Sequence, residues 1–273
     1  MNNFTYSVPT KIHFGKGQIS HLYELSESGN KVLLCYGGGS IKKAGIYDEA
    51  VKILKEEDIE IFELSGIAPN PKIESVREGV KLCKENDIDM VLAIGGGSVI
   101  DCAKVVAAGA CYDGDSWDLV ITPRWIKKAL PIYSVLTLSA TGSEMDPFAV
   151  ISDMSKNEKW GTASEHMKPK MSILDPEYTY SVSKKQTAAG TADMISHICE
   201  NYFTNVKNAD VQARFAEGLL KNCFKYGPIA LEEPDNYDAR ANLMWTASMA
   251  INGILSDGAE VSWCVHPMEH ELS

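Results

Sequence analysis

The sequence predicts an α/β domain with a mostly parallel sheet, followed by an all-helical domain. Two apolar runs, 31–36 and 90–94, each stop at Gly-Gly-Gly-Ser and are followed by apolar residues at helical spacing. After Ser183 only helical patterns continue. Alternating strands and helices favour a parallel sheet that is covered on both faces. We therefore expect an α/β domain over 1–180 and a helical domain over 181–273.

The individual elements follow from apolar periodicity and from the turn residues between them. Strands are expected at 31–36, near 59–62, at 90–94 and at 131–138. In the first domain, helices are expected around 47–54 and 73–83 and from Ser98 through Ala110. The second domain should hold helices at about 184–203, 209–226, 235–255 and 260–271, with breaks at Gly227-Pro228 and Glu233-Pro234.

Composition excludes several classes of partner. The 273 residues include 26 Lys plus Arg against 37 Asp plus Glu, a net charge of -11 without a dense basic run, so we expect no nucleic-acid partner. Seven scattered cysteines without a CxxC pair indicate a reducing, cytoplasmic location. The N-terminus lacks the pattern of a signal peptide, and no apolar run is long enough to span a membrane.

The two glycine-rich turns are candidate phosphate-binding sites. They are Gly37-Gly38-Gly39-Ser40 and Gly95-Gly96-Gly97-Ser98. Glycine allows backbone N–H groups to approach a phosphate closely, and the following helix N-terminus favours an anion. One such turn is equally consistent with a ligand-free connection. Two turns at the ends of neighbouring parallel strands favour a dinucleotide.

The segment from Thr137 to Glu144 follows a further predicted strand and is rich in Ser and Thr. Small hydroxyl side chains at a strand end can bond a ribose or a base, although a solvated loop has the same composition. Ser143 is not in a G-x-S-x-G turn, so serine hydrolysis is not expected.

Two pairs of residues in the helical domain have the spacing of metal ligands. Asp193 and His197 are four residues apart, and so are His266 and His270. On a helix each pair shares one face. Imidazole with carboxylate suits Fe²⁺ or Zn²⁺, which would act as a Lewis acid on a substrate oxygen. Spacing alone leaves open two unrelated helix faces.

Together these motifs resemble the iron-containing (group III) alcohol dehydrogenase family, in particular its NADPH-dependent butanol dehydrogenase branch. The ordered set that carries the resemblance comprises Phe14 to Gly17, Tyr36 to Ser40, Gly95 to Ser98 with Asp101 and Lys104, Thr137 to Glu144, Ala189 to Asp193 with His197, and His266 to His270. The resemblance implies a Rossmann-like first domain and a helical metal-binding domain, in the dehydroquinate synthase-like architecture. It also implies hydride transfer between a nicotinamide and a primary alcohol or aldehyde, and a homodimer.

Residue roles follow from the same resemblance. The metal ligands would be Asp193, His197 and His266, and His270 would lie near the substrate and nicotinamide. The cofactor contacts would be Gly37, Gly38, Gly39, Ser40, Gly95, Gly96, Gly97, Ser98, Asp101, Lys104, Thr137, Leu138, Thr141 and Tyr178. The family's fourth ligand is a histidine that would follow Ser273, so we expect the chain to be a piece of a longer protein. The alternatives are an inactive NADP(H)-binding fragment and a glycerol-dehydrogenase-like enzyme.

The choice of cofactor depends on the first glycine turn. Dinucleotide sites that select NAD(H) place a carboxylate against the adenosine 2′-hydroxyl, where it repels a 2′-phosphate. The family places that residue in this turn, which here contains no acid and is followed by Lys42 and Lys43. We therefore expect NADP(H) to be preferred over NAD(H).

Overall fold

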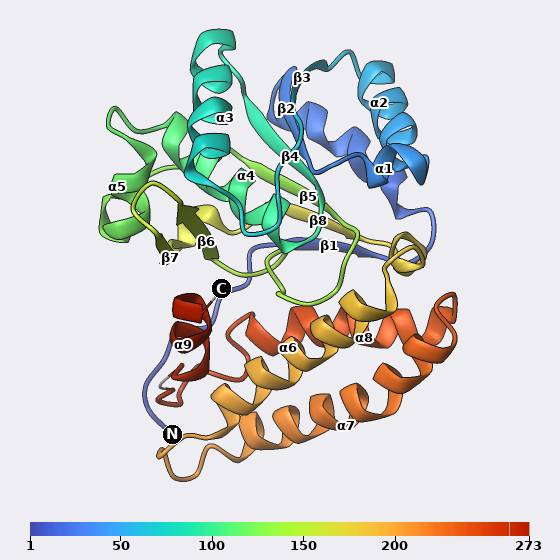
Figure 1. The fold of residues 1–273 in the computed structure, drawn as a ribbon, viewed down its shortest axis with the longest axis vertical. Helices are drawn as coiled ribbons and strands as arrows, with labels where there is room; N and C mark the ends of the chain where they lie inside the picture. The colour runs from blue at the N-terminus through green and yellow to red at the C-terminus, as the bar shows by residue number, and fades with distance from the viewer. Residues whose placement is uncertain (262, 273) are drawn as a thin grey trace.

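A six-stranded parallel sheet forms the first part of the computed structural model, which describes residues 1–261 and 263–272, without the side chains of His270 and Leu272 (Figure 1). The strand order is β1-β8-β5-β4-β2-β3. The strands are β1 (Lys11–Phe14), β2 (Lys31–Tyr36), β3 (Glu60–Leu64), β4 (Met90–Gly95), β5 (Ile132–Leu136) and β8 (Met171–Leu174). The predicted α/β class is therefore confirmed, and β2 and β4, which precede the two glycine turns, are neighbours.

Helices cover both faces of this sheet because its strands are apolar on both sides. In β2, Leu33 and Cys35 face one core, and Val32 and Leu34 face the other. The first core is built with α3 (Ile73–Asn86), α4 (Gly97–Ala110) and α5 (Ser116–Ile121). The second is built with η1 (Gln18–Ser28), α1 (Ser40–Lys43) and α2 (Ile46–Glu56).

An antiparallel hairpin and short 3₁₀ turns complete this part of the chain. The hairpin strands are β6 (Phe148–Asp153) and β7 (Glu158–Ala163), which contact α4 and α5. The turns are η2 (Pro123–Trp125), η3 (Glu165–Met167) and η4 (Pro176–Thr179). Sequence periodicity did not predict the hairpin, because β7 is mostly exposed and carries little apolar pattern.

The rest of the chain is helical in its described residues, as predicted. The helices are α6 (Lys184–Tyr202), α7 (Asp210–Glu232), α8 (Tyr237–Ile251) and α9 (Val265–Leu272). The expected break at Gly227-Pro228 is wrong, because α7 continues through Pro228 to Glu232. Pro228 removes one backbone N–H and crowds the carbonyl four residues earlier, and the packing of α7 against α6 and α8 offsets this cost.

The first residues of the chain lie beside the helical part rather than beside the sheet (Figure 1). The backbone N–H of Asn2 donates to the carbonyl of Gly258 at 2.9 Å, and the amino terminus donates to the carbonyl of Lys207 at 2.9 Å. The division at residue 180 remains a prediction, and these contacts show that residues 1 and 2 join the later helices.

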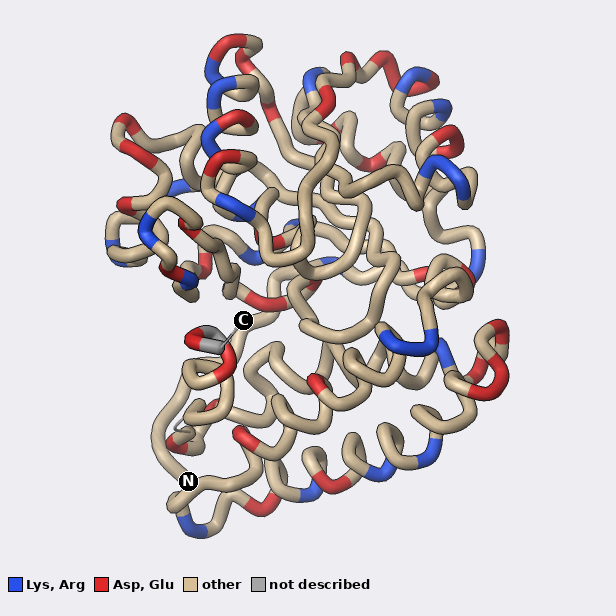
Figure 2. Tube along the Cα trace, viewed as in Figure 1, with Lys and Arg blue, Asp and Glu red and all other residues tan. Residues whose placement is uncertain are grey.

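Charged residues are dispersed over the surface. Lys or Arg alternates with Asp or Glu along α2, α3 and α7 (Figure 2). No helix of the described residues is both long enough and apolar enough to cross a bilayer.

Candidate active site

The main cleft lies where the carboxyl ends of the strands meet the helical part of the chain. Its volume is about 890 Å³, within the range of sites for small molecules and cofactors. The α/β part contributes Ser98, Asp101, Leu138, Thr141 and Lys159, and the helical part contributes Asp193, His197, Trp263 and His266. Residues from both halves therefore face one space, at the edge of the sheet where open parallel sheets bind ligands.

The second glycine turn has the shape of a phosphate cradle. It joins β4 to α4, a helix of 14 residues whose N-cap is Gly96. A Cβ atom at Gly95 would lie 2.6 Å from Val99 Cγ2, and one at Gly97 would lie 2.4 Å from Thr141 Oγ1. Only glycine fits at these two positions. The backbone can therefore lie close to Val99 and Thr141, and it can approach an anion at the helix N-terminus.

The first glycine turn lies beside the second, because β2 pairs with β4. It contains Gly39, whose φ of 98° lies in the left-handed region that favours glycine. The following Lys42 places its ammonium over the rings of Tyr36 and Tyr47, at 4.9 and 4.2 Å from the centroids. The same ammonium lies 3.8 Å from Glu63 Oε2, so the positive charge next to this turn has an acidic neighbour on β3.

Not every predicted cofactor contact lines the cleft. Ser98, Asp101, Leu138 and Thr141 do, whereas Ser40 and the glycines of the two turns do not. The backbone N–H of Thr137 donates to the carbonyl of Gly95, which joins the loop to the second turn. Tyr178 instead packs against the core formed with η1 and α2, and burial raises its pKa. Tyr178 therefore does not line the described cleft, and its contact with the cofactor stays a prediction.

Asp101 and Lys104 form part of a polar network in the wall of the cleft, where Asp101 lines the cleft and Lys104 is buried behind it. Lys104 Nζ is fully buried and donates to Ser143 Oγ at 2.9 Å and to Asp146 Oδ1 at 2.8 Å, as well as to the carbonyl of Phe148 at 2.8 Å. Asp101 accepts from Ser143 Oγ at 2.6 Å. Burial raises the pKa of Asp146 to about 7 and also raises the pKa of Asp101. The network positions the loop, and the direct cofactor contact predicted for Lys104 does not match its buried position.

Asp193, His197 and His266, which we call the cleft triad, come together in space. The Nε2 atoms of His197 and His266 each lie 3.6 Å from Asp193 Oδ1. The two rings are stacked, with centroids 4.6 Å apart and planes 14° apart. In a tetrahedral site with bonds of about 2.1 Å, neighbouring ligand atoms are about 3.4 Å apart. The triad thus fits a single divalent cation with small adjustments.

The orientation of α6 explains why two of these ligands reach the cleft. Its N-cap, Ser183, accepts from the backbone N–H of Gln186 at 3.2 Å. One turn before Asp193, a Cβ atom at Gly190 would lie 2.7 Å from the carbonyl oxygen of Ser139. The close contact at this glycine holds α6 against the loop that follows β5.

Sequence reasoning missed three residues of the site. Buried Glu200 forms a hydrogen bond with His266 Nδ1, the arrangement that orients metal-bound histidines in many proteins. Trp263 packs edge-on against both imidazoles of the triad. Lys159 on β7 lines the cleft and bonds Glu269 of α9 at 3.2 Å. Glu200 lies three residues after His197 on α6, a spacing that could have suggested its role.

Electrostatics favour the metal-binding forms of Asp193 and His197, but they favour the protonated imidazole at His266. Burial opposes a charge on Asp193, but the hydrogen bond from His266 and the proximity of His197 lower its pKa overall. Burial lowers the pKa of His197 and favours the neutral imidazole that binds metals. The pKa of His266 is raised, because hydrogen bonds to Asp193 and Glu200 outweigh its burial. The side chain of His270, predicted to lie near the substrate, is outside the described part of the chain.

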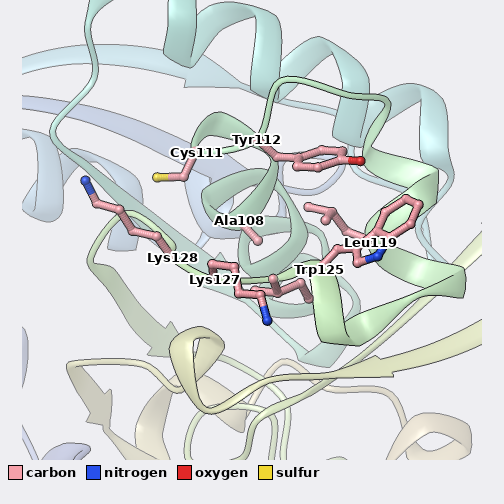
Figure 3. Close-up of a pocket in the computed structure, with 8 residues that line it drawn as sticks. Ala108, Cys111, Tyr112, Leu119, Trp125, Lys127 and Lys128 are labelled. Carbon is pink, nitrogen blue, oxygen red and sulfur yellow. The ribbon is translucent and has the colours of Figure 1, made fainter.

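A second hollow, of about 300 Å³, lies against α4 and α5 (Figure 3). Its lining residues are Ala108, Cys111, Tyr112, Leu119, Trp125, Ile126, Lys127 and Lys128. The described lining contains neither carboxylate nor histidine, and both glycine turns lie elsewhere. The chemistry therefore belongs to the main cleft.

Comparison with known proteins decides the family. The family model for iron-containing alcohol dehydrogenases matches residues 9–176, and that for the C-terminal region of the same family matches residues 187–273. The chain belongs to the iron-containing alcohol dehydrogenase family. This membership confirms the predicted family and architecture, and the cleft triad is the set of residues that fits the divalent metal which the family name implies.

Individual relatives agree with this family. The chain is 59% identical over its whole length to NADH-dependent butanol dehydrogenase A of Clostridium acetobutylicum, covering 70% of that protein. It is 44% identical to the NADPH-dependent aldehyde reductase YqhD of Escherichia coli, covering 71%. The crystal structure of NADH-dependent butanol dehydrogenase A from Thermotoga maritima superposes with a TM-score of 0.97 at 46% identity, over all of this chain and 69% of that one. The relatives' names thus include both nicotinamide cofactors.

Proposed function

We propose that this chain is a metal-dependent alcohol dehydrogenase and aldehyde reductase that transfers a hydride between a primary alcohol or aldehyde and NADP(H). The observation that carries the proposal is the cleft triad, which faces the same cleft as Ser98, the residue that ends the second glycine turn in the first turn of α4. Relatives named as butanol dehydrogenases and an aldehyde reductase support this substrate class.

The two halves of the chain contribute different parts of the proposed reaction: the first binds the cofactor and the second binds the metal. Gly95 to Ser98 would hold the pyrophosphate, and the loop with Thr141 would orient the nicotinamide end of the cofactor. Asp193, His197 and His266 would hold Fe²⁺ or Zn²⁺, which when bound supplies a Lewis acid for the substrate oxygen. Glu200 fixes the ring of His266, and Trp263 covers the two imidazoles and limits the access of water.

Removal of the metal tests this proposal. The purified chain should oxidise NADPH in the presence of butyraldehyde, lose that activity after chelation, and regain it when Fe²⁺ or Zn²⁺ is restored. NADPH binding, followed by fluorescence, should survive chelation because the glycine turns do not depend on the metal. NADPH binding without turnover at any metal loading would support the alternative, a cofactor-binding chain that performs no chemistry.

The preference for NADP(H) is the finer part of the proposal. It is supported by the absence of an acid in the first glycine turn and by the lysines at 42 and 43, which follow it. Gly39→Asp should shift the ratio of kcat/KM values toward NADH, because a carboxylate there repels the 2′-phosphate. Among the described atoms none lies within 4 Å of a Cβ at Gly39, but the positive φ adds strain of about 1–2 kcal/mol.

The matched control is Gly39→Asn, which has the same shape and strain as Gly39→Asp but no charge. It should leave the NADPH-to-NADH ratio close to that of the wild type. If both variants change the ratio equally, strain rather than charge is responsible, and the assignment of this turn to the 2′-phosphate is contradicted.

We also propose a cytoplasmic homodimer. The strand β1 lies at the edge of the sheet as described, with one side available for pairing with a second copy. All seven cysteines are free thiols in the structure, which supports a reducing compartment. Light scattering on the purified chain tests the dimer directly.

A further inference from the structure

A second group of metal-ligating side chains lies outside the cleft. It consists of His13 on β1 with His21 and Glu24 on η1, and we call it the edge cluster. A 3₁₀ helix has three residues per turn, so His21 and Glu24 lie on one face of η1. His13 points to the same side of β1 as Lys11, because strand side chains alternate. None of the three residues lines the cleft as it is described.

The ligand atoms of the edge cluster lie close together around one carboxylate oxygen. His13 Nε2 lies 2.9 Å and His21 Nδ1 lies 3.1 Å from the same oxygen, Glu24 Oε1. The two imidazoles are stacked, with centroids 3.6 Å apart and planes 8° apart. Glu24 and His13 have side chains only 12% and 13% exposed, whereas His21 is 31% exposed. The group is therefore shielded on the protein side and open to water beside His21.

The contacts within the cluster leave one imidazole without a proper partner. Although His13 Nε2 is close to Glu24, it is buried and the contact lacks the geometry of a hydrogen bond. One carboxylate oxygen, Glu24 Oε1, is thus shared by two ring nitrogens and forms a hydrogen bond only with His21 Nδ1. Burying a polar nitrogen without a partner is unfavourable, and a shared cation would satisfy all three groups.

We propose that His13, His21 and Glu24 form a second binding site for a divalent transition metal such as Zn²⁺. Two imidazoles and one carboxylate, with water in the remaining position, are a common donor set for zinc, whereas Mg²⁺ and Ca²⁺ prefer oxygen ligands. Tetrahedral zinc requires neighbouring ligand atoms about 3.4 Å apart, so the measured contacts need to open by a few tenths of an ångström. A zinc ion bound here would link η1 to β1.

Lys11 determines how strongly the site binds. Its ammonium donates to Glu24 Oε2 at 2.7 Å, which leaves Oε1 for the metal but places a positive charge next to it. The Lys11 side chain is 59% exposed and can move into solvent. Lys11→Met should therefore lower the Kd for Zn²⁺ several-fold, measured by competition with a chromophoric chelator, and an unchanged or raised Kd would count against a metal held by Glu24.

The number of zinc ions per chain tests the proposal. The chain is loaded with Zn²⁺, freed of excess by gel filtration and analysed for zinc. Glu24→Gln and His21→Asn should each hold one equivalent less than the wild type, while His166→Asn, a histidine outside both clusters as described, should hold the same. If the two edge-cluster variants hold as much zinc as the wild type, the cluster is only hydrogen-bonded and the proposal is wrong.

Two further measurements keep this result separate from the cleft. In a His197→Asn background, which removes the cleft equivalent, Glu24→Gln should abolish the zinc that remains. Should a variant fail to fold, wild-type crystals soaked in Zn²⁺ give the answer through anomalous scattering at the zinc edge. A peak between His13, His21 and Glu24 is expected, and density without a peak there would overturn the proposal.

Discussion

The two halves of the molecule build their parts of the active site in different ways. The α/β half uses backbone turns, and a single stretch of sequence, Gly95 to Ser98, supplies the strand end, the turn and the helix start. The helical half uses side chains that meet from distant segments, since Asp193 and His197 lie on α6 and His266 on α9. The first kind of site is local and tolerant of distant changes. The second depends on packing across the whole domain.

The roles of the two halves are distinguished most clearly by a variant that removes one charge from the cleft triad. Asp193→Asn keeps the shape of the side chain but deprives the metal of its carboxylate. Lewis-acid assistance amounts to several kcal/mol, so kcat/KM for butyraldehyde should fall by at least about 10²-fold. The Kd for NADPH should stay within about twofold, because the phosphate turn is untouched.

The control for this variant is Asp210→Asn, at the start of α7 and outside both described metal clusters. It should retain normal turnover. A fall in NADPH affinity as large as the fall in turnover for Asp193→Asn would contradict the division of labour between the two halves.

The supporting carboxylate Glu200 offers a finer test of the helical half. Glu200→Gln weakens the hydrogen bond to His266 Nδ1 and should reduce metal affinity by about 10- to 100-fold. Metal Kd values from chelator competition measure this effect. Glu217→Gln on α7, which loses contacts to Tyr202 and Arg214, should leave the Kd unchanged. Equal losses in both variants would indicate general damage to the helices instead of a role for Glu200.

The contact between the halves can be strained at Gly190. Gly190→Ala places a methyl group 2.7 Å from the carbonyl oxygen of Ser139 and 3.2 Å from Ala140 Cβ. Overpacking of this kind lowers the free energy of unfolding by about 1–3 kcal/mol. Urea denaturation measures it.

Gly218→Ala is the matched helix substitution for Gly190→Ala. No described atom lies within 4 Å of a Cβ at Gly218, so helix propensity should raise the free energy of unfolding by up to about 1 kcal/mol. If Gly190→Ala is stabilising to the same degree, α6 is not held against the loop after β5 in the way the structure shows.

The smallest expected effect concerns the α/β half alone and depends on pH. Arg77 donates to Asp115 at 2.8 and 2.9 Å, and these hydrogen bonds hold the pKa of Asp115 below its ordinary value. The stabilisation is present above the unfolded-state pKa and is lost as the pH falls through the folded-state pKa. Both side chains are nearly half exposed, so the pair contributes only about 0–1 kcal/mol.

Arg77→Gln measures this contribution. The difference between the free energies of unfolding of wild type and variant, from urea titrations, should be largest near neutral pH and shrink as the pH falls through the lowered pKa of Asp115. A difference that grows on acidification would contradict the sign of the pKa shift.

Local patterns predicted most of the fold. The apolar run 31–36 and the run 90–94 became β2 and β4, because four to six buried residues before a glycine turn have few alternatives to a parallel strand. The hairpin β6–β7 was not predicted, since its exposed strand gives no alternation of apolar residues. The pair Gly227-Pro228 predicts a break, yet Pro228 lies within the last turns of α7.

The candidate site was predicted less evenly. Helical spacing identified Asp193 and His197 as neighbours, but their approach to His266 depends on how α9 packs and was inferred only from resemblance to the family. For Lys104 and Tyr178, residue type does not predict the position of the side chain. Their residue types suit a cofactor, yet one is enclosed by Ser143 and Asp146, and the other packs against the core. The edge cluster joins a strand and a 3₁₀ helix, so spacing along the sequence does not place His13 beside His21 and Glu24.

We propose that the cleft triad binds a divalent metal independently of the cofactor turns. Elemental analysis of the purified wild-type chain and of His197→Ala, with NADPH titrated into the same samples, tests it most directly. The wild type should hold one equivalent more of iron or zinc than His197→Ala, with the same NADPH affinity. Equal metal content in the two proteins, or loss of NADPH binding without loss of metal, would contradict it.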